Sequence, residues 1–176
     1  LAKARRVSLL TIPGMAGRLH LSPLPGTWDG VADAGAVRRD LRAIAAAGAT
    51  VLVTLVEASE LPLALADWRA EVAAAGLDFL HLPIPDFGVP DAGFEAAWSA
   101  AELAARLAAG ETVAIHCRAG LGRTGTIAAR LMMESAGLDA AAAIATIRRD
   151  HAAEAVETAA QEAWLGGAER RDSRGG

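Results

Sequence analysis

The residue types best suited to chemistry lie in one short segment. The single cysteine of the 176-residue chain, Cys117, precedes Arg123 by six positions and Thr124 by seven. A short glycine-bearing loop before a helix can turn its backbone N–H groups inward and form an anion-binding nest. The guanidinium of Arg123 can complete this nest with two parallel hydrogen bonds to phosphoryl oxygens. The other residues predicted to bind phosphate are Arg118, Ala119, Gly120, Leu121 and Gly122.

The same nest would make the thiol of Cys117 a nucleophile. Inward N–H groups and a helix dipole stabilise a thiolate, and a thiolate below a bound phosphate is placed for in-line attack. The donors also meet the oxygens on which charge develops during the reaction. The structural alternatives are a buried apolar thiol and a loop that only turns the chain. Neither explains Cys, Arg and Thr at this spacing, so we favour the reactive cysteine.

A phosphate ester also needs a proton on its leaving oxygen, which a carboxylic acid beside the nest can supply. The segment 82–91 contains three prolines and a glycine, is predicted to be a loop, and carries Asp86 and Asp91. Asp91 has a structural alternative as the N-cap of a following helix, whereas Asp86 has none. We therefore predict Asp86 as the general acid, which then serves as the base for water attack.

The elements that must position these residues follow from the pattern along the chain. Alanine- and leucine-rich runs that end at glycines predict helices, and β-branched or leucine-rich runs predict strands. The predicted helices span 37–47, 62–75, 92–109, 124–136, 140–149 and 153–165, with Asp139 as an N-cap. The predicted strands span 7–12, 18–21, 50–56, 79–82 and 112–116. This alternation predicts a three-layer α/β domain.

Composition narrows the functional classes. Apolar residues make up 53% and charged residues 22%, which excludes a disordered chain or a coiled coil. The net charge of −4 gives no positive field for nucleic acid or an anionic membrane, and no stretch approaches the ~18 apolar residues of a membrane span. We expect one domain over 1–168 and a disordered tail over 169–176. A lone cysteine favours the reducing cytoplasm.

Residues 116–125 resemble the His-Cys-x5-Arg-[Ser/Thr]-Gly signature of the protein tyrosine phosphatase superfamily at every fixed position. The resemblance implies that Cys117 forms a phosphocysteine and that Arg123 holds phosphate and stabilises the transition state. It further implies that the Thr124 hydroxyl helps the thiolate leave, and that His116 sets the acidity of the cysteine. No metal or other cofactor is expected, because thiolate, guanidinium and N–H groups supply the electrostatics.

Two further segments are similar to the same superfamily. Residues 85–90 resemble its mobile acid loop, with Ile84 where classical members have tryptophan. Residues 148–161 are similar to a segment whose glutamines order the hydrolytic water; Gln161 matches the second polar position, and Glu157 stands at the first. The structural alternative for Gln161 and Glu157 is an ordinary exposed helix face.

Less specific motifs, over 22–26, 39–41 and 53–61, look like the cyclin-dependent-kinase-associated subgroup of dual-specificity phosphatases. This likeness implies a central sheet of about five mostly parallel strands. Glu57 can pair with Arg123 in such a fold, although we favour a solvated loop charge. His151 is predicted in a loop near the site; it could touch substrate, but we favour a place at the surface.

The sequence therefore predicts a cysteine-dependent protein phosphatase that acts on phosphotyrosine, with dual specificity as an extension. The chain has no tyrosine to wall a deep cleft, which favours a shallow pocket. The expected partner is a phosphorylated protein or a small phosphate ester, and the oligomeric state stays open. Alternatives are a phosphatase of inositol phosphate, lipid or nucleotide, and a non-catalytic phosphate-binding module. Asp86 and His116 argue against a sulfurtransferase or an arsenate reductase.

Overall fold

The computed structural model describes residues 6–30 and 32–172, and five strands of this part form one sheet. The strands are β1 (Ser8–Thr11), β2 (Arg18–Ser22), β3 (Ala49–Thr54), β4 (Asp78–His81) and β5 (Thr112–His116). Their order is β1-β2-β5-β3-β4; β1 is antiparallel to β2, and all other neighbours are parallel. The predicted mostly parallel sheet of about five strands is confirmed.

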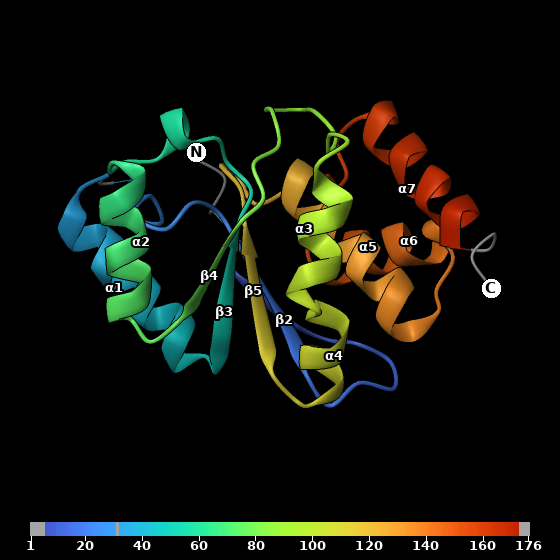
Figure 1. Ribbon diagram of the computed structural model, residues 1–176, viewed down its shortest axis with the longest axis horizontal. Coiled ribbons are helices and arrows are strands. Elements are labelled where there is room, and N and C mark those ends of the chain that lie inside the picture. The colour runs from blue at the N-terminus through green and yellow to red at the C-terminus, as the bar shows by residue number, and fades with distance from the viewer. Residues whose placement is uncertain (1–5, 31, 173–176) are drawn as a thin grey trace.

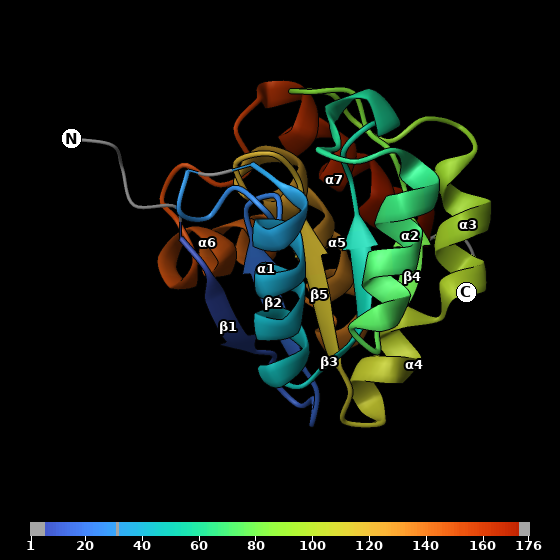
Figure 2. The same cartoon turned by 90° about the vertical axis from the view of Figure 1, so that its left-hand side faces the viewer.

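Helices cover both faces of the sheet, which confirms the predicted three-layer α/β class (Figure 1). One face carries α1 (Ala34–Ala46) and α2 (Leu65–Ala74), which lie in front of the sheet in Figure 2. The other face carries α3 (Phe94–Ala101), α4 (Leu103–Ala108), α5 (Gly122–Ala136), α6 (Ala140–Asp150) and α7 (Ala159–Asp172). Because both faces are covered, every residue of the central strand β5 is buried.

The chain reverses its direction across the sheet at β5. It passes from β3 through α2 to β4 on one face, and returns through α3 and α4 on the other face to place β5 between β2 and β3. The loops that leave β3 and β5 therefore diverge at the carboxyl ends of these strands. Such a switch point opens a crevice, and ligands of parallel α/β sheets bind in this crevice. The segment that begins at Cys117 starts here.

The predicted helix ends are correct where a capping residue next to the helix determines them. Asp139 caps α6 as predicted, since its side chain accepts a hydrogen bond of 2.7 Å from the backbone N of Ala142. Gly137 ends α5 in the left-handed region, with a φ of 65°. Both positions depend only on residues within one turn, so the pattern could reveal them.

The predicted single helix over 92–109 is wrong, because Glu102 breaks it into α3 and α4. Glu102 has a φ of 48° and a ψ of 39°, in the left-handed region. The spacing of the buried residues explains the break. Phe94 and Trp98 are four residues apart, and so are Leu103 and Leu107, but Leu103 follows Trp98 by five residues instead of the three or four that keep one helix face. One straight helix would turn the second pair away from the core, and the break restores its register.

Two predicted helix starts are also corrected. Helix α2 begins at Leu65 rather than at Pro62, because residues 58–60 form a 3-10 turn and Leu61 is extended behind it. Gly93 occupies the N-cap position of α3 that was predicted for Asp91. The Asp91 carboxylate instead accepts a hydrogen bond of 2.9 Å from the N of Gly93, within the turn that precedes the helix.

The last helix differs most from its prediction. Helix α7 begins at Ala159 rather than near residue 153, and it continues through Gly166 to Asp172. Leu165 and Ala168 are buried on either side of this glycine, and their packing outweighs its low helix propensity. The predicted tail over 169–176 therefore starts too early, since 169–172 are helical; residues 173–176 lie outside the described residues. In the described part of the chain, no helix is long and apolar enough to cross a membrane.

Candidate active site

The loop over residues 117–123 is predicted from the sequence to bind phosphate and is called the phosphate-binding loop. It curls around the sulfur of Cys117. Strand β5 ends at His116, and α5 begins at Gly122. Cys117 is 3% exposed, and its Sγ accepts a hydrogen bond of 3.3 Å from the backbone N of Gly120. The sulfur thus lies beside an inward-pointing N–H group at the amino end of a fifteen-residue helix. This N–H group is one member of the anion-binding nest that the sequence predicts.

Contacts from distant segments hold the shape of this loop. The backbone N of Leu24 donates to the carbonyl of Arg118 at 3.1 Å. Gly120 has a φ of 77°, and a Cβ at this position would come within 2.7 Å of the carbonyl oxygen of Ser22. Only glycine satisfies both the left-handed backbone and this close approach. The chain after β2 and the phosphate-binding loop therefore fix each other.

His151 is a buried support of the same loop, so its predicted place at the surface is wrong. Its Nε2 lies 2.7 Å from the carbonyl oxygen of Gly120, to which it donates, and its Nδ1 accepts from the hydroxyl of Ser8 at 2.8 Å. Burial lowers the pKa of His151, which favours this neutral form. His151 thus connects strand β1 to Gly120, the residue whose N–H group faces Cys117.

Arg123 is the most heavily bonded side chain of the site, and it is only 2% exposed. Its Nη1 donates to a carboxylate oxygen of Glu60 at 2.8 Å and to the carbonyl of Ile84 at 2.9 Å. Its Nη2 donates to the other Glu60 oxygen at 3.0 Å and to Asp86 at 3.0 Å. Its Nε has no hydrogen-bond partner among the described residues. This N–H group therefore stays available for a phosphoryl oxygen.

The residue that orients Arg123 is Glu60, not Glu57. Glu57 is exposed and starts the 3-10 turn, and its backbone N donates to the Glu60 side chain at 2.9 Å. This capping bond aims the Glu60 carboxylate inward. The hydrogen bond from Arg123 lowers the pKa of Glu60, so the pair is ionised and fixed. Glu60 also pairs with the exposed Arg118 at 3.3 Å.

The acid loop, defined here as residues 82–91, brings Asp86 rather than Asp91 to the site. The Oδ1 of Asp86 lies 3.0 Å from Nη2 of Arg123, and its side chain is 44% exposed. The same oxygen accepts from the N of Phe87 at 3.1 Å. Asp86 therefore contacts the buried guanidinium of Arg123, while part of its side chain stays accessible to solvent. Asp91 caps its own turn, and no hydrogen bond or ion pair joins it to Arg123 in the described part of the chain.

A chain of buried hydrogen bonds leads away from Cys117 through His116. The Nδ1 of His116 donates to the carbonyl of Cys117 at 3.1 Å, so its Nε2 accepts from the hydroxyl of Thr54 at 2.8 Å. That hydroxyl in turn accepts from Nε1 of Trp68 at 3.3 Å. Burial lowers the pKa of His116 to about 4. The ring is therefore neutral at pH 7, and the chain fixes which nitrogen carries its proton.

This chain predicts that Thr54 supports the nucleophile without touching substrate. In Thr54→Val the buried His116 Nε2 loses its donor, and we expect a roughly three- to tenfold slower alkylation of Cys117 by iodoacetamide at fixed pH. Thr54→Ser keeps the hydroxyl and should react like the wild type. Equal alkylation rates for all three proteins would show that His116 holds its orientation without Thr54.

Thr124 and Gln161 are fully buried beside the loop, and Glu157 is exposed at its edge. The Thr124 hydroxyl has no hydrogen-bond partner in the described part of the chain. The carboxylate of Glu157 lies against Gly122, where a Cβ would collide with it. Partial desolvation of the carboxylate where it lies against Gly122, and the nearby charge of Asp86, raise the pKa of Glu157, although the residue as a whole is exposed. The exposed-helix alternative is therefore wrong for Gln161, which is buried in α7. Glu157 is exposed, as that alternative holds, but it precedes α7 rather than lying in it.

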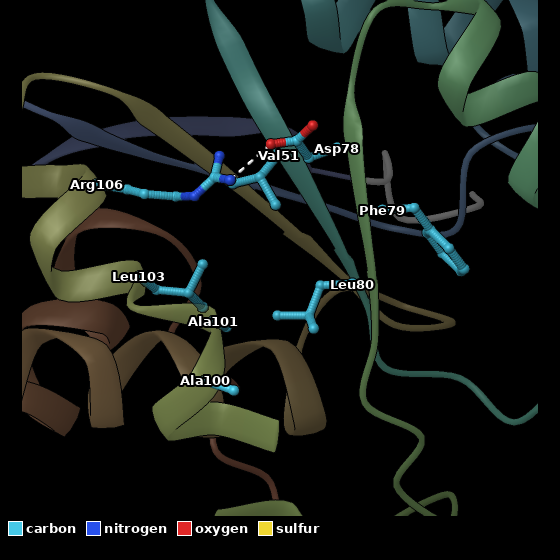
Figure 3. Close-up of a pocket in the computed structure, with 8 residues that line it drawn as sticks. All are labelled: Val51, Asp78, Phe79, Leu80, Ala100, Ala101, Leu103 and Arg106. Atoms are coloured by element: carbon cyan, nitrogen blue, oxygen red, sulfur yellow. Dashed lines mark hydrogen bonds and ion pairs between the residues drawn. The ribbon is translucent and has the colours of Figure 1, made fainter. Parts of the chain in front are cut away.

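A second hollow lies at the other end of the sheet. A groove of about 330 Å³ runs between β4 and the break between α3 and α4, and the ion pair of Arg106 and Asp78 spans it at 2.6 Å (Figure 3). Val51 and Asp78 line it near the starts of their strands, whereas the phosphate-binding loop follows the end of β5. The groove is therefore separate from the nest around Cys117. No group of three or more potential metal ligands occurs among the described residues.

The fold and the loop together define a class. A cysteine and an arginine lie on one loop at the switch point of a sheet with helices on both faces, as in cysteine-dependent phosphatases. Comparison with known families gives the same answer. A family model described as "Polymorphic toxin system, DSP-PTPase phosphatase" matches residues 30–137. The chain belongs to this family of phosphatases, within the dual-specificity branch of the protein tyrosine phosphatase superfamily.

Solved structures extend the likeness over nearly the whole chain. Tk-PTP in its active form is 32% identical with a TM-score of 0.70, and the match covers 93% of this chain and 97% of Tk-PTP. Kinase associated phosphatase, with its catalytic cysteine changed to serine, is 24% identical with a TM-score of 0.75, over 98% and 97% of the two chains. Human DUSP28 is 20% identical with a TM-score of 0.64, over 94% and 95%. The last two likenesses concern the fold.

Proposed function

We propose that the protein is a phosphotyrosine phosphatase with activity toward phosphoserine and phosphothreonine, and that it works through a phosphocysteine. The observation that carries the proposal is the convergence on one loop of Cys117, an N–H donor to its sulfur, and Arg123 held together with Asp86. Nucleophile and anion site come from one loop, and the acid comes from a segment 37 residues before Arg123 in the sequence. A binding module would need the loop but not the acid.

In the first step the sulfur of Cys117 attacks phosphorus, and the bond between phosphorus and the leaving oxygen breaks. Protonated Asp86 gives its proton to that oxygen, so the product leaves as a neutral alcohol or phenol. The Nε of Arg123 and the inward N–H groups of the loop bind the equatorial oxygens, where negative charge is spread in the transition state. Glu60 keeps the guanidinium in place during this step.

In the second step water attacks phosphorus, and the bond between phosphorus and sulfur breaks. Asp86, now a carboxylate, takes the proton from the water. The buried hydroxyl of Thr124 can donate to the departing thiolate, for which its lack of another partner leaves it free. Phosphate is released, and the enzyme returns to its starting protonation state.

The rim of the site favours an aromatic phosphate ester. Phe87 follows the acid directly, is 60% exposed, and is held at a φ of 58° by the turn it occupies. An exposed aromatic ring beside the acid can stack on a phenyl leaving group. The exposed cation of the loop, Arg118, is already paired with Glu60, which disfavours a second phosphate on the substrate. We place the protein in the cytoplasm, where its thiol stays reduced.

Initial rates on phosphotyrosyl and phosphoseryl peptides, inositol phosphates and nucleotide monophosphates test this proposal. We expect phosphotyrosyl peptides to give the highest kcat/KM, with rates that EDTA does not change. In Phe87→Ala the KM for phosphotyrosyl peptide should rise roughly three- to tenfold, while that for a phosphoseryl peptide changes little. A preference for inositol or nucleotide esters would replace the proposed substrate class, and loss of activity with EDTA would contradict the metal-free mechanism.

A further inference from the structure

The turn that carries Asp86 is anchored on both sides. Residues 85–88 form a tight turn in which the N of Gly88 donates to the carbonyl of Pro85 at 2.8 Å. Before the turn, the carbonyl of Ile84 accepts from Nη1 of Arg123 at 2.9 Å. After Asp86, the carbonyl of Gly88 accepts from Nε2 of Gln161 at 3.1 Å. The first anchor belongs to the phosphate-binding loop, and the second comes from α7, which lies beside the acid loop in Figure 1.

The amide of Gln161 is fixed in one orientation by its other bonds. Its Oε1 accepts from the backbone N of Glu157 at 2.9 Å and from that of Thr158 at 3.2 Å. The hydroxyl of Thr158 accepts in return from the backbone N of Gln161 at 3.1 Å, which completes a capping box at the start of α7. With Oε1 committed to the cap, Nε2 must point to the acid loop. Gln161 is fully buried, so water does not compete for this bond.

We propose that Gln161 is a positioning residue that holds Asp86 over the phosphate-binding loop by bonding the carbonyl of Gly88. The inference rests on the proposed phosphatase activity. It differs from the role that the family resemblance implies, in which this glutamine orders the hydrolytic water. A positioning role acts in the first step, where Asp86 protonates the leaving group. A water-ordering role acts in the second step, where phosphocysteine is hydrolysed.

The kcat values for substrates with different leaving groups distinguish the two roles of Gln161. A poor leaving group such as phenol depends on the general acid, whereas 4-nitrophenol leaves with little help. For the wild type we expect similar kcat values for phenyl phosphate and 4-nitrophenyl phosphate. Gln161→Glu keeps Oε1 for the cap but has no N–H group for Gly88. Its kcat should fall roughly three- to tenfold more for phenyl phosphate than for 4-nitrophenyl phosphate, the effect of one hydrogen bond.

Two further variants separate positioning from stability. Gln161→Ala loses the bond to the acid loop without adding a charge near Asp86, and it should show the same selective loss. Thr158→Ala loses part of the cap but keeps the bond to Gly88, so it should lower Tm and leave the ratio of the two kcat values unchanged. A Thr158→Ala ratio that changes as much as that of Gln161→Ala would assign the effect to the helix cap and overturn the inference.

The remaining outcomes are also decisive. If the Gln161 variants keep the wild-type ratio and accumulate phosphocysteine, seen as a burst of phenol in rapid-mixing experiments, Gln161 orders water and the positioning role is wrong. If they keep the ratio without a burst, Gln161 acts only on the fold. If the wild type hydrolyses neither ester, the proposed function fails, and the inference fails with it. A selective loss for phenyl phosphate, in an active wild-type background, supports the positioning role.

Discussion

Cys117→Ser should abolish turnover of aryl phosphates while leaving the fold and the binding of a phosphotyrosyl peptide intact. A serine hydroxyl is a far weaker nucleophile than a thiolate at neutral pH. The nest proposed to bind phosphate consists of backbone groups and Arg123, which the substitution leaves in place. We expect kcat to fall by roughly 10⁴- to 10⁶-fold, the usual cost of removing a covalent nucleophile. Steady-state rates measure the loss, and calorimetry measures the retained binding.

Unchanged Tm and an unchanged Kd for the peptide serve as the control that the loop of Cys117→Ser is intact. Rapid quenching of the wild type with a labelled aryl phosphate should trap a phosphorylated protein, and the variant should give none. Turnover by the variant within tenfold of the wild type would contradict a phosphocysteine mechanism. Water would then attack the substrate directly.

Sequence reasoning reached the parts of the site that local patterns specify. The phosphate-binding loop is one continuous segment between a buried strand and a helix, so its chemistry and its secondary structure can be predicted together. Asp86 emerged because the competing carboxylate, Asp91, had a local capping task, and the structure shows Asp91 bonded within its own turn. The central strands followed from the runs 50–56 and 112–116, which carry apolar residues on both faces, as burial between two helical layers requires. The number and direction of the strands came from the family resemblance.

The supporting residues depend on folding contacts that no local pattern reveals. Glu57 and Glu60 are both carboxylates in the loop after β3, and only the 3-10 turn between them decides which one faces Arg123, 63 residues away. In the sequence, His151 is a polar residue that follows a predicted helix. In the structure, it donates a hydrogen bond to the carbonyl of Gly120, 31 residues earlier. In the sequence, Thr54 is an ordinary β-strand residue, and only the fold brings His116 and Trp68 within hydrogen-bond distance of its hydroxyl. Pairings across such distances arise from topology.

Asp86→Asn should lower kcat by roughly 10²- to 10⁴-fold for poor leaving groups, with a much smaller loss for 4-nitrophenyl phosphate. Asparagine keeps an oxygen that can accept from Arg123 and from the N of Phe87, so the acid loop retains its contacts. It cannot donate an acidic proton to the leaving oxygen. The kcat of the variant should therefore fall steeply as the leaving group becomes poorer, whereas that of the wild type should change little. Rates with a series of aryl phosphates, from 4-nitrophenyl to phenyl phosphate, measure the effect.

The matched control is Asp91→Asn, in the same loop five residues away. Its carboxylate accepts only a local bond from Gly93, so this variant should keep the wild-type leaving-group dependence and change mainly Tm. The reverse pattern, with a steep leaving-group dependence for Asp91→Asn alone, would make Asp91 the acid and would require the loop to move during catalysis. The Gln161 variants provide an intermediate case, because they keep the acid but loosen its loop. Their leaving-group dependence should therefore fall between those of the wild type and Asp86→Asn, since a mispositioned acid retains part of its effect.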